Sequence, residues 1–409
     1  MGIARFGRSA DVFSMSALEH VVLAEPPVTP APLALALAPR PEPVVDEERA
    51  AFQAAVVEAE AAVAESRYED AIAALAGRPV PAAAHPDLAL GALFAESWAR
   101  MYLGDLRTAL ERGERARAIA EGPLFNDCDR AESLYRLGCV QVKLNAIAAA
   151  TSLFTLALEL AERSGLPCDR LRAEIYEWRS RCYQRRRDFE AARQDVERAL
   201  ELAQAVGDEH VAAHAHFRAS VIAERTGQVL LARFYAENAM TLYERCGDRV
   251  NTGRLLNNLG GLTFLLGKPD EAKAHLKQAV AVALDTGSDA DAAQAINSLA
   301  QVHLRTGEPE PAERHARHAL ELLGGREDFV DEIGNAQLVL GRALLAQGRH
   351  DEAAGCFERA DVTFGRLDST SHRAAAWMAQ GDLAAARGDK DAALERFRAA
   401  AEALQDFHF

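Results

Sequence analysis

Aromatic residues and long apolar runs are scarce in this 409-residue sequence. Aromatic side chains make up 6% of the chain although 49% of it is hydrophobic, so most of the apolar content is Ala and Leu. No apolar run approaches the roughly 18–20 residues that a membrane-spanning helix needs, and the PAPLALALAP segment is short and flanked by Pro. A membrane span and a signal peptide are therefore not expected, and we predict a cytoplasmic protein.

β-branched residues are also sparse, and no stretch alternates apolar and polar residues with a period of two. Ala has the highest helix propensity and lets helices approach closely. The composition therefore predicts an all-α fold. The net charge of −15 argues against a general nucleic-acid or membrane-surface binder, which would usually be basic.

The sequence also lacks paired-cysteine motifs and catalytic motifs. The six Cys have no C-x-x-C pair and no regular spacing, so we expect reduced, packed thiols instead of disulfides or a zinc site; they are residues 128, 139, 168, 182, 246 and 356. No Gly-rich phosphate loop, nucleophile elbow or paired-carboxylate arrangement occurs. We therefore predict no enzyme activity, no cofactor and no metal.

Residues 1–46 differ in composition from the rest of the chain. Seven of the 15 Pro lie there, which prevents a continuous helix. We predict a flexible Pro-rich arm over 1–46 and one repetitive region over 47–409.

A period of about forty residues runs through that region, the sign of a solenoid. A small residue stands five positions after a turn residue in nine units, at Ala71, Ala109, Ala150, Ala192, Ala232, Ala272, Ala312, Ala353 and Ala393. A second alanine follows seven residues later in eight of them, at Ala116, Ala157, Ala199, Ala239, Ala279, Ala319, Ala360 and Ala400. We call these two sets the landmark alanines.

Each unit is expected to be two antiparallel helices joined by a tight turn. In Gly267-Lys268-Pro269-Asp270, Gly can end the first helix in a left-handed conformation and Pro can start the second. The first landmark alanine would lie where the two helices cross, and stacked pairs would bury the apolar faces that one pair cannot. This predicts an α-solenoid, a right-handed superhelix of about nine helix pairs.

The pattern over residues 47–409 resembles the tetratricopeptide repeat family. The best matches are Leu259-Gly260 with Ala272 and Ala279, and Leu340-Gly341 with Ala353. The LNNL and INSL strings are similar to the long repeats of kinesin light chains and of bacterial quorum-peptide receptors. The resemblance implies a scaffold that binds a protein or an extended peptide in a concave groove lined by the first helix of each pair.

Counting back from the landmark alanines identifies the side chains expected to line that groove. Amides can pair with a peptide backbone and Arg can bind carboxylates, so a partner of acidic character is expected. The predicted groove residues are Arg136, Lys143, Trp178, Arg181, Arg185, His214, Arg218, Arg225, Arg254, Asn257, Asn258, Asn297, Gln301, Arg305 and Arg342.

Several alternatives remain open at this point. The chain could be the peptide-sensing half of a transcriptional regulator whose DNA-binding module is absent here. It could also be a structural oligomer that pairs through the last helix, with Leu404, Phe407 and Phe409. The basic and aromatic segment 170–193 could also contact nucleic acid. The acidic character of the rest of the chain argues against that partner. His210 and His214 share a helix face that could suit a metal, but no carboxylate pattern completes a site, so we interpret both as structural or groove residues.

Overall fold

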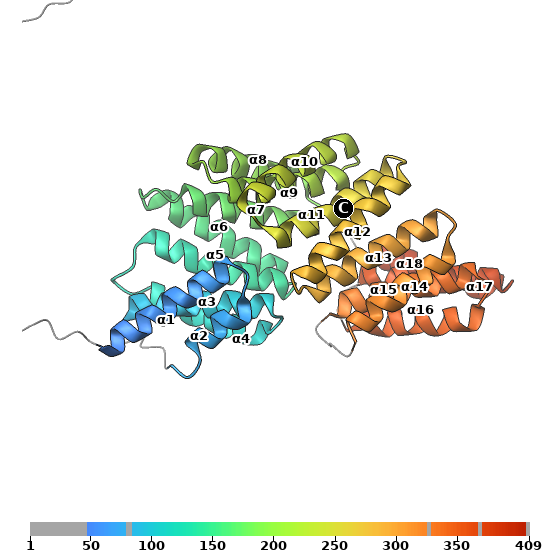
Figure 1. Ribbon diagram of the computed structural model, residues 1–409, viewed down its shortest axis with the longest axis horizontal. Coiled ribbons are helices and arrows are strands. Elements are labelled where there is room, and N and C mark those ends of the chain that lie inside the picture. Colours follow the sequence, from blue (N-terminus) through green and yellow to red (C-terminus); the bar gives the residue numbers. More distant parts are fainter. Residues whose placement is uncertain (1–46, 79–83, 325–328, 367–369, 406–409) are drawn as a thin grey trace, which may run out of the picture. The chain divides into compact units, whose positions relative to one another are not determined.

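The described part of the chain is a stack of helices (Figure 1). The computed structural model describes residues 47–78, 84–324, 329–366 and 370–405. These ranges contain no strand. The helices are α1 (Glu47–Ala64), α2 (Tyr68–Leu75), α3 (Pro86–Tyr102), α4 (Leu106–Ala120), α5 (Asp127–Lys143), α6 (Ile147–Arg163), α7 (Asp169–Arg185), α8 (Phe189–Val206), α9 (Glu209–Arg225), α10 (Val229–Cys246), α11 (Arg249–Leu265), α12 (Pro269–Asp285), α13 (Asp289–Arg305), α14 (Pro309–Leu322), α15 (Val330–Ala346), α16 (His350–Gly365), α17 (Thr370–Ala386) and α18 (Lys390–Gln405).

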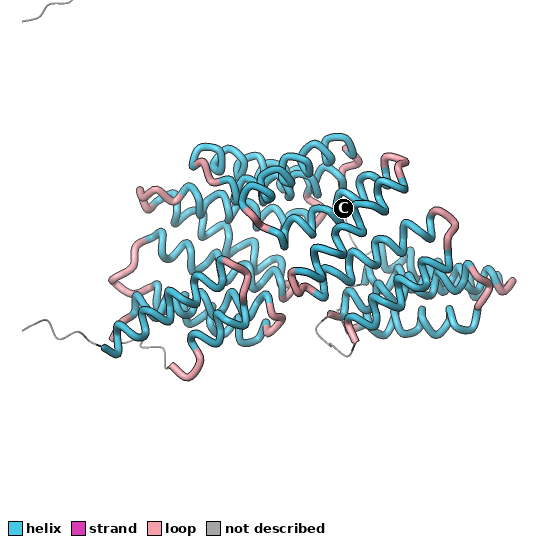
Figure 2. The backbone as a smooth tube through the Cα atoms, viewed as in Figure 1, coloured by secondary structure: helices cyan, strands magenta, loops and turns pink. Residues whose placement is uncertain are grey.

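Backbone contacts divide the chain into residues 1–46 and residues 47–409. The predicted Pro-rich arm lies outside the described residues. Within the second unit, consecutive helices pack as pairs from α1–α2 to α17–α18, and short loops join them (Figure 2). We call each pair a repeat and number the repeats one to nine. The all-α solenoid of about nine helix pairs is confirmed.

The turn inside each repeat has a fixed backbone conformation. The residue five positions before the first landmark alanine has a positive φ in every repeat. Six of these residues are glycine, and Ser66, Asn145 and Arg187 are the exceptions, with φ of 58°, 61° and 62°. Because an L side chain is strained in this region, the turns of repeats one, three and four hold a conformation that glycine would adopt more easily.

The landmark alanines lie where the helices meet. All nine alanines of the first set and all eight of the second set are buried. The period deduced from the sequence therefore identifies the closest helix contacts correctly.

A second size constraint operates between residues sixteen positions apart in one repeat. A Cβ added to Gly260 would lie 2.5 Å from Cγ of Leu276, and one added to Gly341 would lie 2.4 Å from a ring carbon of Phe357. In repeat seven, Ala300 stands at the glycine position, and the buried residue sixteen later is Ala316. A large side chain on the second helix thus packs against a glycine on the first, and a small side chain packs against an alanine.

The two helices of a repeat occupy different layers. The backbone of each odd-numbered helix lies close to that of the next odd-numbered helix, whereas no two even-numbered helices have backbones this close over the described ranges. The odd-numbered helices therefore form the more closely spaced layer. We call it the first-helix layer.

The expectation that all six cysteines are reduced was wrong. Cys128 and Cys168 form a disulfide with their Cα atoms 6.5 Å apart. They stand at the start of α5 and just before α7, forty residues apart in the sequence. That separation is one repeat period, and a shared position in adjacent repeats brings the two residues together. Cys139, Cys182 and Cys356 are buried free thiols, and Cys246 is an exposed one.

Two further expectations concern the surroundings of the protein. No described helix is both long and apolar enough to cross a membrane. Cytoplasmic localisation stays a prediction. For the proposed pairing through the last helix, Leu404 is exposed, whereas Phe407 and Phe409 lie outside the described residues.

The same substitution, glycine to alanine, tests the size constraint at the adjacent residues Gly260 and Gly261. Gly260→Ala should lower the free energy of unfolding by about 1–2 kcal/mol, because the new methyl group would overlap Leu276. Gly261→Ala should raise it by about 1 kcal/mol, because a Cβ there meets nothing within 4 Å and Ala favours the helix. Urea unfolding of both variants measures the difference. Shifts of the same sign would contradict this packing.

The disulfide should appear in thiol counts and in stability. The unfolded, unreduced protein should expose four thiols and not six. Reductant should lower the urea midpoint, since closing a loop of this length contributes about 4 kcal/mol in the chain-entropy treatment. A Cys128→Ser/Cys168→Ser variant is the control and should not respond to reductant. Identical wild-type curves with and without reductant would disprove the cross-link.

Candidate functional site

The predicted groove residues all lie in the first-helix layer. They occupy α5, α7, α9, α11, α13 and α15, two or three on most of these helices and Arg342 alone on α15. The even-numbered helices contribute none. The layer therefore presents a polar, mainly cationic set of side chains along six successive repeats.

An ion-pair cluster occupies the middle of this layer. Glu177 of α7 is buried, and its Oε1 accepts hydrogen bonds from Nε of Arg181 at 3.0 Å and from Nε of Arg218 at 3.0 Å. Burial acts to raise the pKa of Glu177, but the two guanidinium groups outweigh it and hold the pKa below its ordinary value. Burial and the nearby Arg181 lower the pKa of Arg218 to about 10. One buried carboxylate thus offsets two partly buried cations and joins α7 to α9.

Trp178 is a correction to the predicted site. Its side chain is buried in the core formed with the third and fourth repeats, so it is not available to a peptide. The Arg181 guanidinium lies 4.1 Å from the centre of the indole ring and covers it. The indole ring of Trp178 therefore stabilises the Arg181 guanidinium by a cation–π contact.

Amides and an ion pair continue the layer through α11. Ser220 donates to Oδ1 of Asn258 at 3.1 Å, and Nδ2 of Asn258 donates to Glu224 at 3.3 Å. Arg254 binds Asp291 of the next odd helix, with its Nε 2.9 Å from Oδ2. These three contacts connect α9, α11 and α13.

Asn257 and Asn297 stand at equivalent positions one period apart. The Oδ1 atom of each is buried and accepts no hydrogen bond from the described residues. Nδ2 of Asn297 makes one long contact, 3.5 Å from the carbonyl oxygen of Glu332. An unsatisfied buried acceptor costs about 1–3 kcal/mol, so both positions are poor choices for stability alone.

The remaining predicted cations differ in how far they are neutralised. Arg136 pairs with Glu132 at 2.7 Å, and Arg185 donates to the Asn145 side chain at 2.9 Å. Because Asn145 is neutral, Arg185 is one of five predicted cations that make no ion pair within the described ranges; the other four are Lys143, Arg225, Arg305 and Arg342. Gln301 is an exposed amide.

Lys143 reports on the surroundings of the layer. Solvent reaches its side chain, yet the surrounding protein and the positive charges of Arg181, Arg254 and Arg185 lower its pKa to about 8. Since Arg254 belongs to α11, helices three repeats apart come within electrostatic reach of one another. The layer therefore concentrates positive charge at Lys143.

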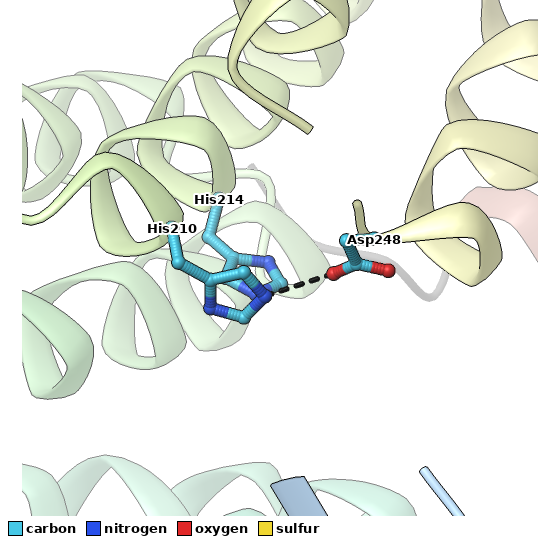
Figure 3. A group of neighbouring side chains, drawn as sticks. All are labelled: His210, His214 and Asp248. Carbon is cyan, nitrogen blue, oxygen red and sulfur yellow. Dashed lines mark hydrogen bonds and ion pairs between the residues drawn. The ribbon is translucent and has the colours of Figure 1, made fainter. Parts of the chain in front are cut away.

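A histidine cluster lies at the start of α9 (Figure 3). His210 Nε2 lies 2.8 Å from Oδ2 of Asp248, and Nδ1 of the predicted residue His214 lies 2.9 Å from the Tyr243 hydroxyl. Burial lowers the pKa of His214 to about 4. Asp248 is the carboxylate that the sequence reasoning did not find, and Tyr243 was missed too. Asp248 stands 38 residues after His210, so its position at the head of the next repeat is the signal that could have identified it.

A cleft near the start of the described chain contains none of the predicted residues. It has a volume of about 460 Å³ and lies among α2, α3 and α4. Arg100 and Arg112 line it, and both bind Glu96 at 2.9 Å. Arg78 and Arg115 also line it.

Comparisons with known proteins agree with this architecture. Profiles described as tetratricopeptide repeat match residues 173–206, 211–285, 251–324, 316–371 and 338–406. The chain belongs to the tetratricopeptide repeat family. Members of this family are protein- and peptide-binding scaffolds, and that general role is the one this chain shares. The family gives no support to a catalytic role. No curated protein sequence matches significantly.

Solved structures show the same fold at low sequence identity. A Rap protein in complex with competence and sporulation factor has a TM-score of 0.61 and 14% identity, over 88% of this chain and 98% of that one. The apo quorum sensor NprR from B. thuringiensis has a TM-score of 0.60 and 13% identity, over 88% and 100%. Apo RapI has a TM-score of 0.58 and 12% identity, over 87% and 98%. These tetratricopeptide repeat proteins establish the fold.

The Glu177 cluster gives a stability test of the layer. Glu177→Gln should lower the free energy of unfolding at pH 7 by about 3 kcal/mol, because two partly buried guanidinium groups lose their shared buried carboxylate. Removing one cation as well, in Glu177→Gln/Arg218→Gln, should recover part of the loss. Because the pKa of Glu177 is lowered on folding, its contribution is full above the ordinary carboxyl pKa and decreases as the pH falls below it. Denaturant unfolding at pH 7 and pH 4 measures both effects, and a Glu177→Gln protein as stable as wild type at pH 7 would refute them.

Proposed function

We propose that the first-helix layer binds an extended peptide or a partner's tail, with Asn257 and Asn297 holding its main chain. The observation that carries this proposal is the pair of buried amide oxygens, one period apart, that accept no hydrogen bond from the described residues. A backbone N–H of a bound peptide would satisfy each of them. Asn297 is buried, so its side chain would have to turn toward the peptide. The amide nitrogen of the same side chain could donate to a peptide carbonyl, so binding would not depend on the peptide sequence.

The charges of the layer favour an acidic partner. Glu177, Asp291 and Glu132 neutralise Arg181, Arg218, Arg254 and Arg136. The cations without a carboxylate partner remain available to carboxylates of a ligand; they are Lys143, Arg185, Arg225, Arg305 and Arg342. An added negative charge beside Lys143 would oppose both the surrounding protein and the nearby arginines, which together lower its pKa.

A sensory role is the second candidate. Two of the similar structures are a Rap protein complexed with competence and sporulation factor and the apo form of a quorum sensor. The similarity extends over nearly their whole length. The same peptide-binding layer would then act as the sensing half of a regulator.

Selected peptides can test the role of the two asparagines. Peptides chosen from a random displayed library against the full chain should be enriched in Asp and Glu. For the best of them, fluorescence anisotropy should give a Kd at least tenfold weaker with Asn257→Ala/Asn297→Ala than with wild type, because both main-chain contacts are lost.

The matched control is Gln278→Ala, which should leave the Kd unchanged. It removes an exposed amide from α12, an even-numbered helix outside the first-helix layer. Thermal unfolding of each variant separates lost binding from lost folding. Equal affinity of the double variant and wild type would rule out the asparagines. Selection of no peptide at all by the folded wild type would rule out the peptide-binding proposal itself.

A further inference from the structure

Three side chains converge between repeats five and six with the chemistry of metal ligands. His210, His214 and Asp248 each offer one ligand atom, and these atoms lie within 4.8 Å of one another. All three side chains are partly buried. Figure 3 shows the two imidazole rings side by side on α9, with the carboxylate facing them from the segment that leads into α11.

The fold holds these groups in place from both repeats. His210 and His214 are four residues apart on α9, which puts them on the same helix face, and their ring centres are 4.5 Å apart. Asp248 is the N-cap of α11, and its Oδ1 accepts from the backbone N–H of Asn251 at 3.0 Å. The carboxylate is therefore fixed by the helix that it caps.

We propose that His210, His214 and Asp248 bind a divalent transition-metal ion of the Zn²⁺ type. Two imidazole nitrogens and one carboxylate oxygen form a set that Zn²⁺ accepts, and three protein ligands leave a fourth position for water or for a carboxylate of a bound partner. The site goes beyond peptide binding by the layer and does not depend on it.

The distances suit coordination without backbone movement. Ligand atoms on a tetrahedral ion lie roughly 3.3 Å apart when the bonds are about 2.0–2.1 Å. His210 Nε2 and Asp248 Oδ2 are 2.8 Å apart and share a hydrogen bond. Small side-chain rotations would open this pair to the ion, and His214 would complete the set.

Tyr243 selects the nitrogen of His214 that would coordinate. Its hydroxyl engages Nδ1, which leaves Nε2 as the ligand atom. A partner on the other ring nitrogen is the usual companion of a metal-bound histidine, because it fixes the ring orientation. Tyr243 is fully buried, so it is a positioning residue.

Asp248 is the carboxylate that remains for a cation. It makes no ion pair with Arg or Lys within the described ranges, and its one pair there is with His210 at 2.8 Å. The neighbouring Asp208 and Glu174 pair with Arg170, and Glu177 pairs with Arg181 and Arg218.

A second histidine–carboxylate group provides a control, because its carboxylate already binds a lysine. His303 Nδ1 lies 2.5 Å from Oε2 of Glu308, and His315 stacks on His303. Lys273 occupies the other carboxylate oxygen at 2.7 Å. Its ammonium group stands where a metal would need negative charge, so no binding is expected there.

Calorimetric titration of the chelator-treated full-length protein with ZnCl₂ tests the proposal. The Cys246→Ser background should be used, so that the exposed thiol cannot bind zinc. One ion should bind per chain. His214→Ala and Asp248→Asn should each weaken binding at least tenfold, the latter because Asn keeps the helix cap but is a poor zinc ligand. His303→Ala should bind as the parent does.

Further measurements keep the result interpretable if a variant is unstable. Each variant is melted without metal, and His210→Gln provides a second ligand variant because 45% of the His210 side chain is exposed. Tyr243→Phe should weaken binding by roughly tenfold while leaving all three ligands in place. Co²⁺ should give a visible absorption band in the parent that is lost in His214→Ala. No binding by the parent, or equal binding by the parent and the folded His214→Ala protein, would overturn the site.

Discussion

Each repeat depends on one close helix crossing, where a residue with little or no side chain faces a residue sixteen positions later. The crossing admits Leu276 against Gly260 and Phe357 against Gly341, but only Ala316 against Ala300. A large side chain on the second helix is therefore present where the first helix carries glycine, and a small one is present where the first helix carries alanine. The close approach of the two helices depends on this match in each of these repeats.

The period in turn determines which polar side chains can meet. Polar contacts between repeats recur at separations close to one period: 41 residues for Arg218 and Glu177, 37 for Arg254 and Asp291, and 38 for Ser220 and Asn258. The disulfide obeys the same rule at 40 residues. Every such contact joins neighbours in the stack. The first-helix layer is therefore a chain of nearest-neighbour links, in which the two unsatisfied asparagine oxygens are exceptions.

This division explains what could be predicted from the sequence. The turns and the landmark alanines belong to local patterns, and the residues that make each contact lie within about twenty positions, so their spacing is visible in the chain. Contacts between repeats join residues about forty positions apart, and nothing local marks the partner. Asp248 caps α11 through local contacts, but its role beside His210 depends on the stacking of two repeats. The pairing of Cys128 with Cys168 was missed for the same reason, although their separation equals the period. Trp178 was assigned to the correct helix, but a neighbouring Arg181 covers it.

The disulfide has a mechanical consequence. It encloses α5 and α6 of repeat three and links them to the start of α7. If the chain were pulled from its two ends, the segment between the two cysteines could not extend, and its fully stretched length would be about 140 Å. The other repeats would lengthen under load, whereas in this one the disulfide would carry the force between the two cysteines. Its own tight turn, at Asn145, would then carry no tension.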